Sequence, residues 1–75
     1  MPKLRVLSGR EVCQIMAEHG FIEVRRKGSH IIVQKRKGGT TITVPVPDHD
    51  ELKMGTLLGI IRQAGLSRSL FEARE

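Results

Sequence analysis

One histidine stands beside three cations and two small residues in the segment Arg25-Arg26-Lys27-Gly28-Ser29-His30. Histidine titrates closest to neutral pH among the side chains, so it can give or take a proton. Lysine and arginine offset phosphate charge, and serine donates a hydrogen bond to a phosphate oxygen. Glycine lets a ligand backbone approach closely. These residue types fit a site that holds a phosphate group and moves a proton.

Positive charge is concentrated around this segment. Six of the 13 Lys and Arg residues lie between positions 25 and 37, where there is no Asp or Glu, and the net charge is +5. Such an excess favours a polyanionic partner bound in a salt-sensitive way. The same pattern is also typical of a solvated hairpin whose cations protect exposed sheet edges. Charge alone leaves both interpretations open.

The composition limits the fold and the mode of recognition. A chain of 75 residues has room for one domain, residues 1–75, with a compact core built from few elements. Trp and Tyr are absent and only Phe21 and Phe71 are aromatic, so the core must be aliphatic. Base stacking is therefore not expected to dominate nucleic-acid recognition, whereas recognition of backbone and shape remains open.

Cysteine usage and hydropathy favour a cytoplasmic protein. Cys13 is the only cysteine, so neither an intramolecular disulfide nor a cysteine metal cluster can form. The first seven residues lack the apolar centre of a secretory signal, and no apolar run approaches the ~18 residues that span a bilayer. We expect no cofactor, no metal and no membrane association.

Capping residues and apolar spacing predict two helices. Ser8 followed three residues later by Glu11 predicts a capping box, and Gly20 suits a helix end, so we expect a helix over residues 9–19. Apolar residues at helical spacing predict a second helix over residues 54–64, closed by Gly65. A short turn or helix follows, with Leu70 and Phe71.

Three strands are predicted between the helices. Alternating residues over 21–26 indicate a half-buried strand, and residues 30–35 and 40–46 indicate two more, joined by turns at 27–29 and 36–39. Ile42, Val44 and Val46 share one face, which predicts a sheet covered on one side, and Pro45 and Pro47 are expected to end the third strand. The fold class is α+β, an α-β-β-β-α chain with two helices on one face of a three-stranded antiparallel sheet.

This order is the topology of double-stranded-RNA-binding domains, and several motifs narrow the comparison. They are Gly20-Phe21, Lys27-Gly28-Ser29-His30, Ile42-Thr43-Val44-Pro45, Gly55-Thr56-Leu57 and Ile61-Arg62-Gln63-Ala64-Gly65-Leu66. In combination, from about residue 8 to residue 71, the chain resembles the HicA family of toxins from type II toxin-antitoxin systems.

The resemblance implies an mRNA interferase, a small endoribonuclease that acts on mRNA and is held inactive by a HicB antitoxin. It also implies that the histidine of the Gly-Ser-His element, here His30, is the catalytic residue. The chain departs in one respect from general double-stranded RNA binders. Those proteins carry a lysine cluster where the second helix begins. That cluster is reduced here to Lys53, so tight duplex binding is not expected.

Metal-free RNA cleavage needs a base for the ribose 2′-hydroxyl, an acid for the leaving 5′-oxygen, and cations for the charged phosphorane. If Ile31 and Val33 face the helices, His30 and Ile32 lie on the open face or at its rim, within reach of substrate. The residues expected to contact RNA are Arg25, Arg26, Lys27, Gly28, Ser29, Lys35, Arg36, Lys37 and Lys53.

Two further positions have alternative interpretations. His49, between Asp48 and Asp50, suits a second proton-transfer group or a metal ligand, but three adjacent loop residues do not readily converge on one ion, which favours a solvated turn. The backbone N–H groups that begin the second helix beside Lys53 suit a phosphate, or they are simply capped.

Three functions therefore compete. The first is an endoribonuclease toxin that uses His30 and is neutralised by an antitoxin. The second is a non-catalytic RNA-binding module whose basic hairpin, with Arg36 and Lys37, follows phosphates. The third is a protein-interaction domain whose positive surface docks an acidic partner.

Overall fold

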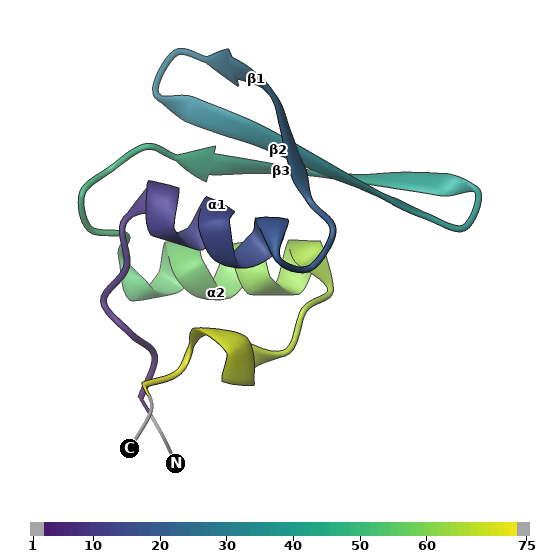
Figure 1. Ribbon diagram of the computed structural model, residues 1–75. Helices are drawn as coiled ribbons and strands as arrows, with labels where there is room; N and C mark the ends of the chain where they lie inside the picture. Colours follow the sequence, from purple (N-terminus) through teal and green to yellow (C-terminus); the bar gives the residue numbers. More distant parts are fainter. Residues whose placement is uncertain (1–2, 74–75) are drawn as a thin grey trace.

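A computed structural model describes residues 3–73 of the chain. The elements are α1 (Gly9–Ala17), β1 (Ile22–Lys27), β2 (His30–Lys37), β3 (Thr40–Pro47), α2 (Met54–Ala64) and a 3-10 helix η1 (Arg68–Phe71). Both helices lie against one face of a twisted antiparallel sheet with strand order β1-β2-β3 (Figure 1). The predicted α-β-β-β-α fold is confirmed, and its layout is consistent with that of double-stranded-RNA-binding domains. None of the helices described is long and apolar enough to cross a membrane.

The capping box predicted for α1 is present. The N–H of Glu11 donates to Ser8 Oγ at 3.1 Å, and the N–H of Ser8 donates to Glu11 Oε1 at 2.9 Å. The helix ends two residues earlier than predicted, with a turn over residues 18–20 that includes Gly20 at φ 96°. The second helix has the predicted bounds and is closed by Gly65 in the left-handed conformation.

The sheet is built from two tight hairpins. Each connection has two residues, Gly28-Ser29 and Gly38-Gly39, and in each the first glycine alone has positive φ, at 61° and 62°. This is the pattern of a type II′ turn, whose twist matches that of the flanking strands. Strand β2 therefore continues through Arg36 and Lys37, which were predicted to lie in a loop.

Of the two prolines predicted to end the third strand, Pro47 is its last residue, whereas the prediction was wrong for Pro45, which lies inside the strand. Both lie within β3, opposite Ile32 and His30 of β2. Since β3 is an edge strand, its prolines can sit where the missing N–H would have pointed to solvent rather than to β2.

The core lies between the sheet and the two helices. The described strands contribute Ile31, Val33, Val44 and Val46, all at most 2% exposed, and the helices contribute Val12, Met16, Leu57, Ile60, Ile61 and Ala64. Phe21 and Phe71, the two aromatic residues, are also fully buried in this cluster. The two terminal segments lie side by side, because Leu4 forms an antiparallel bridge with Glu72 that holds residues 3–5 beside residues 71–73. One face of the sheet is thus covered and the other is open, as predicted.

Strand β1 is not half-buried as its alternation suggested. All six of its residues are exposed, including Ile22 at 65% and Val24 at 39%. An irregularity between Glu23 and Arg25 interrupts the alternation, so Ile22 falls on the open face and Glu23 on the helix side. The edge position and this bulge leave the strand without a covering element.

Candidate functional site

His30 is the first residue of β2 and directly follows the Gly28-Ser29 turn. It is exposed, and it lies between Lys27 of β1 and Pro47 of β3 in the strand register. Directly opposed residues point to the same face of a sheet, so Lys27 and His30 share the open face. The imidazole therefore lies on an accessible surface beside a cation.

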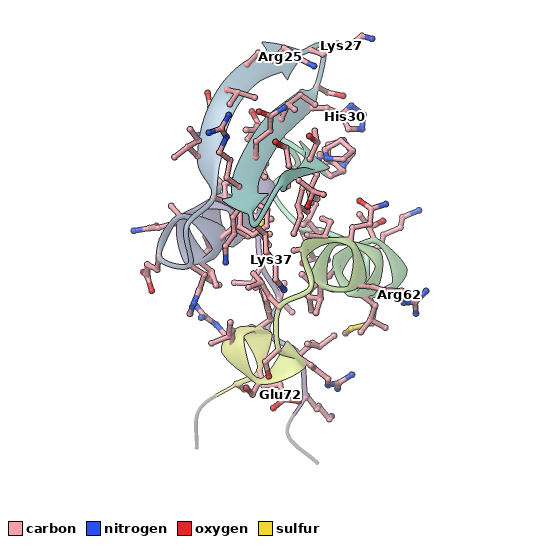
Figure 2. The ribbon with its side chains drawn as sticks, turned by 90° about the vertical axis from the view of Figure 1, so that its right-hand side faces the viewer. Arg25, Lys27, His30, Lys37, Arg62 and Glu72 are labelled. Carbon is pink, nitrogen blue, oxygen red and sulfur yellow. The ribbon has the colours of Figure 1, made fainter. Side chains whose placement is uncertain are left out.

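The next set of opposed residues on the open face again places a cation on β1 and a proline on β3. Arg25 lies opposite Ile32, and Ile32 lies opposite Pro45. Ile32 is only 9% exposed although it is not part of the core cluster, because its neighbours on this face flank it on both sides. Figure 2 shows Arg25, Lys27 and His30 together at one end of the sheet. This open-face site, as we call it, is formed by Arg25, Lys27, His30, Ile32 and Pro45.

The six clustered cations divide between the two faces of the sheet. Strand register places Arg25, Lys27 and Arg36 on the open face, and Arg26, Lys35 and Lys37 on the opposite side. Lys35 extends its Nζ over the ring of Phe21, 5.7 Å from the centroid. Arg36 is six positions along β2 from His30, about 20 Å at the rise of a strand. Only Arg25 and Lys27 therefore share both face and end with His30.

Arg26 points away from the open-face site and forms an ion pair. Its Nη1 donates to Asp48 Oδ2 at 2.7 Å, and its Nε is 3.9 Å from Glu23 Oε2. The hydrogen bond from Arg26 holds the pKa of Asp48 below its ordinary value of 3.8, and the same bond raises the pKa of Arg26. The charge of Arg26 is thus offset within the protein, and its predicted contact with RNA stays a prediction.

The segment after β3 is attached to the turn that precedes His30. The N–H of Asp48 donates to the carbonyl oxygen of Ser29 at 2.7 Å, and the N–H of Gly9 donates to the carbonyl oxygen of His49 at 2.9 Å. Gly9 is required here because a Cβ at this position would collide with the carbonyl oxygen of Pro47. This role of Gly9 and Asp48 carries no local sequence signal, since their partners are at least 19 residues away along the chain.

A comparison with protein families now identifies the chain. The sequence model described as the HicA toxin of bacterial toxin-antitoxin systems matches residues 9–66, which include both helices, the whole sheet and the open-face site. The chain belongs to the HicA toxin family. No curated protein matches it significantly. Membership in this family gives a toxin role and implies an antitoxin partner.

The remaining predicted site residues of this HicA family member include Lys53 and His49, which lie outside the strands. Lys53 is exposed at the N-cap of α2 and makes no side-chain capping bond. His49 is exposed, and its role as a second proton donor or acceptor stays a prediction. Within residues 3–73 no group of three or more His, Cys, Asp or Glu side chains is arranged to hold a metal ion. Lys37 is the last residue of β2, next to the turn of the β2-β3 hairpin, and this hairpin points toward the viewer in Figure 2.

A separate groove of about 540 Å³ lies between α1 and β1, on the helix side of the sheet. Its lining includes Cys13, Ala17, Phe21 and Val33. Burial raises the pKa of the Cys13 thiol from 9.0 to about 11, so the thiol is protonated at neutral pH. A nucleophilic cysteine needs the thiolate, so Cys13 is a packing residue at the edge of the core.

Proposed function

We propose that this protein is a metal-independent endoribonuclease toxin that cleaves mRNA with His30 as its catalytic residue and is inhibited by a HicB-type antitoxin. The observation that carries the proposal is the position of His30. His30 is exposed on the open face, beside Lys27 and near Arg25. The family to which the chain belongs is a family of toxins. The described strands place no acidic side chain on that face, since Glu23 lies on the helix side.

The proposed RNA cleavage requires few protein groups besides His30 and the neighbouring cations. His30 accepts the proton of a ribose 2′-hydroxyl and the 2′-oxygen attacks phosphorus. The bond to the 5′-oxygen then breaks, that oxygen takes a proton from water, and a 2′,3′-cyclic phosphate is left. Lys27 and Arg25 offset the negative charge that develops on the phosphorane. Ser29 donates to a phosphate oxygen, and Gly28 leaves room for the RNA backbone because nothing lies within 4 Å of the place a Cβ would occupy.

Charge also supports the choice of partners. The net charge of +5 and the uncompensated cations of the open-face site attract RNA phosphates and carboxylates alike. An antitoxin that covers this surface would exclude RNA by occupying the same cations. Arg36 and Lys37 lie at the other end of β2 from His30 and serve longer-range attraction of RNA rather than catalysis. Lys53, exposed at the N-cap of α2, is a further cation for RNA.

The test compares the purified protein with its His30→Ala variant on a defined single-stranded RNA in EDTA. We expect new RNA ends with the wild type and a loss of cleavage of at least about 100-fold in the variant, the scale of general acid-base catalysis. Circular dichroism establishes that both are folded, and His19→Ala is the matched control because His19 lies near the C-terminal end of α1, outside the open-face site.

Other outcomes identify the competing functions. Binding of RNA by both folded proteins without cleavage would support the non-catalytic RNA-binding module. Absence of RNA binding even at low salt would support a domain that docks only an acidic protein. Cleavage lost equally in the His49→Ala variant would add His49 as the second proton-transfer group.

A further inference from the structure

Asp48 contacts the residue before His30 and a residue of the neighbouring strand β1. Its N–H donates to the carbonyl oxygen of Ser29, the residue before His30, at 2.7 Å. Its carboxylate accepts a hydrogen bond from Arg26, also at 2.7 Å, and Arg26 is the strand partner of Ile31, the residue after His30. Asp48 thus holds the segment Ser29-His30-Ile31 directly at Ser29 and indirectly at Ile31, through Arg26.

Asp48 is itself held by the helix layer. The second carboxylate oxygen, Oδ1, lies 3.5 Å from Arg10 Nε, on the first turn of α1. The neighbouring His49 carbonyl accepts from the N–H of Gly9, so the segment is joined to α1 by backbone as well as by charge. The hairpin end that carries His30 is thereby connected to the helices through Asp48.

These contacts are poorly suited to a purely stabilising role. The side chains of Arg26 and Asp48 are 49% and 24% exposed, and ion pairs with this much solvent contribute little to the free energy of unfolding. Their effect on geometry is larger than their effect on stability, because displacing a catalytic group by about 1 Å can slow a reaction by up to ~100-fold.

We propose that Asp48 is a positioning residue, whose ion pair with Arg26 fixes the Ser29-His30-Ile31 segment so that the imidazole is held at the substrate. This inference rests on the proposed catalytic role of His30. It adds to that role a residue from a different segment, 18 positions later in the chain. Asp48 touches neither RNA nor the reacting atoms; it acts through Arg26 and the backbone.

The kinetic test uses Asp48→Asn and Asp48→Glu, with Asp50→Asn as the matched control. Asp50 is fully exposed and contacts only the edge of the cluster, 3.9 Å from Arg10. We expect Asp48→Asn to lower kcat about tenfold with KM changed less than twofold, Asp48→Glu to restore most of kcat, and Asp50→Asn to resemble the wild type. A reduced kcat that Asp48→Glu does not restore, or an unchanged kcat in Asp48→Asn, would overturn the inference.

A double-mutant cycle tests whether the effect passes through Arg26. If it does, Arg26→Gln lowers kcat as much as Asp48→Asn, and the double variant is no slower than either single variant. Independent, multiplying losses would show that Asp48 does not act through Arg26 and would overturn the inference.

An RNA-free measurement separates this inference from the proposed function. Amide hydrogen exchange and ¹⁵N relaxation of residues 29–31 should show greater mobility in Asp48→Asn than in the wild type or Asp50→Asn. If no wild-type cleavage is found, the proposed function fails by itself, while the relaxation data still decide whether Asp48 holds the segment. Unchanged mobility would overturn the positioning role even if His30 proves catalytic.

Discussion

The two hairpin turns have nearly the same local chemistry. Each has two residues, begins with a glycine at φ close to 60°, and follows a run of three cations in which the middle residue is arginine. In sequence they differ mainly in the residue that follows, His30 after Gly28-Ser29 and Thr40 after Gly38-Gly39. They differ in what surrounds them.

The Gly28-Ser29 turn is attached to the body of the protein, whereas the Gly38-Gly39 turn is not. The first lies beside the segment after β3 and is held by Asp48. The second lies at the far tip of the β2-β3 hairpin, which projects beyond the helices (Figure 1). Among the described residues its side-chain bond is local, from Thr40 Oγ1 to the carbonyl of Lys37 at 3.0 Å. A basic turn can position a catalytic group only where the rest of the fold restrains it.

The largest expected effect comes from breaking the attachment at Gly9. In Gly9→Ala the new Cβ would collide with the Pro47 carbonyl, so the segment carrying Asp48 must shift. We expect a loss of about 1–3 kcal/mol in the free energy of unfolding, seen as a lower Tm. The matched control is Gly59→Ala within α2, where nothing lies within 4 Å; it should be stabilising by up to ~1 kcal/mol. A wild-type Tm for Gly9→Ala would contradict the attachment.

The two turn glycines provide a direct comparison. Gly28→Ala and Gly38→Ala both force a side chain to adopt positive φ in open space, so each should cost about 1 kcal/mol of stability. RNA cleavage should slow only in Gly28→Ala, because only that turn precedes the proposed catalytic residue. Equal slowing in the two variants, measured at equal fractions folded, would remove the distinction between the turns.

Removing pairs of cations at the two turns tests which of them contribute to RNA binding. Arg25→Gln with Lys27→Gln should weaken RNA binding about fivefold and lower the salt dependence by about one unit of slope for each lost phosphate contact. Arg36→Gln with Lys37→Gln removes the same charge at the free tip, and we expect a smaller loss. Filter binding over a range of salt concentrations measures both. A larger loss at the tip would instead favour the non-catalytic RNA-binding module.

The smallest expected effect is a dependence of stability on pH. The hydrogen bond from Arg26 lowers the pKa of Asp48 in the folded state, so folding is favoured while Asp48 is ionised. This contribution is present above the ordinary pKa of 3.8 and is lost as the pH falls through the lower folded value. The difference in Tm between wild type and Asp48→Asn should therefore be constant from about pH 7 to pH 5 and shrink as the pH falls below 3.8. A difference independent of pH would contradict the ion pair.

Element types and most bounds were predictable because they depend on nearby residues. The Ser8-Glu11 capping box, the glycine turns and the apolar face of α2 are local signals, and the structure agrees with them. The exposure of β1 was not predictable, because alternation cannot show that a strand is an edge or that a bulge interrupts it. The position of Pro45 inside β3 was not predictable for the same reason, since proline is tolerated inside a strand only when that strand is an edge.

The sequence by itself determined the helices, the two hairpins, the concentration of charge and the candidate histidine, since each follows from residues within a few positions of one another. Only the tertiary structure decided that Arg26 and Lys35 turn away from His30 while Arg25 and Lys27 share its face, because strand register sets the direction of every side chain. It alone also brought Asp48 to Arg26, 22 residues apart, because contacts between distant segments depend on how the elements pack.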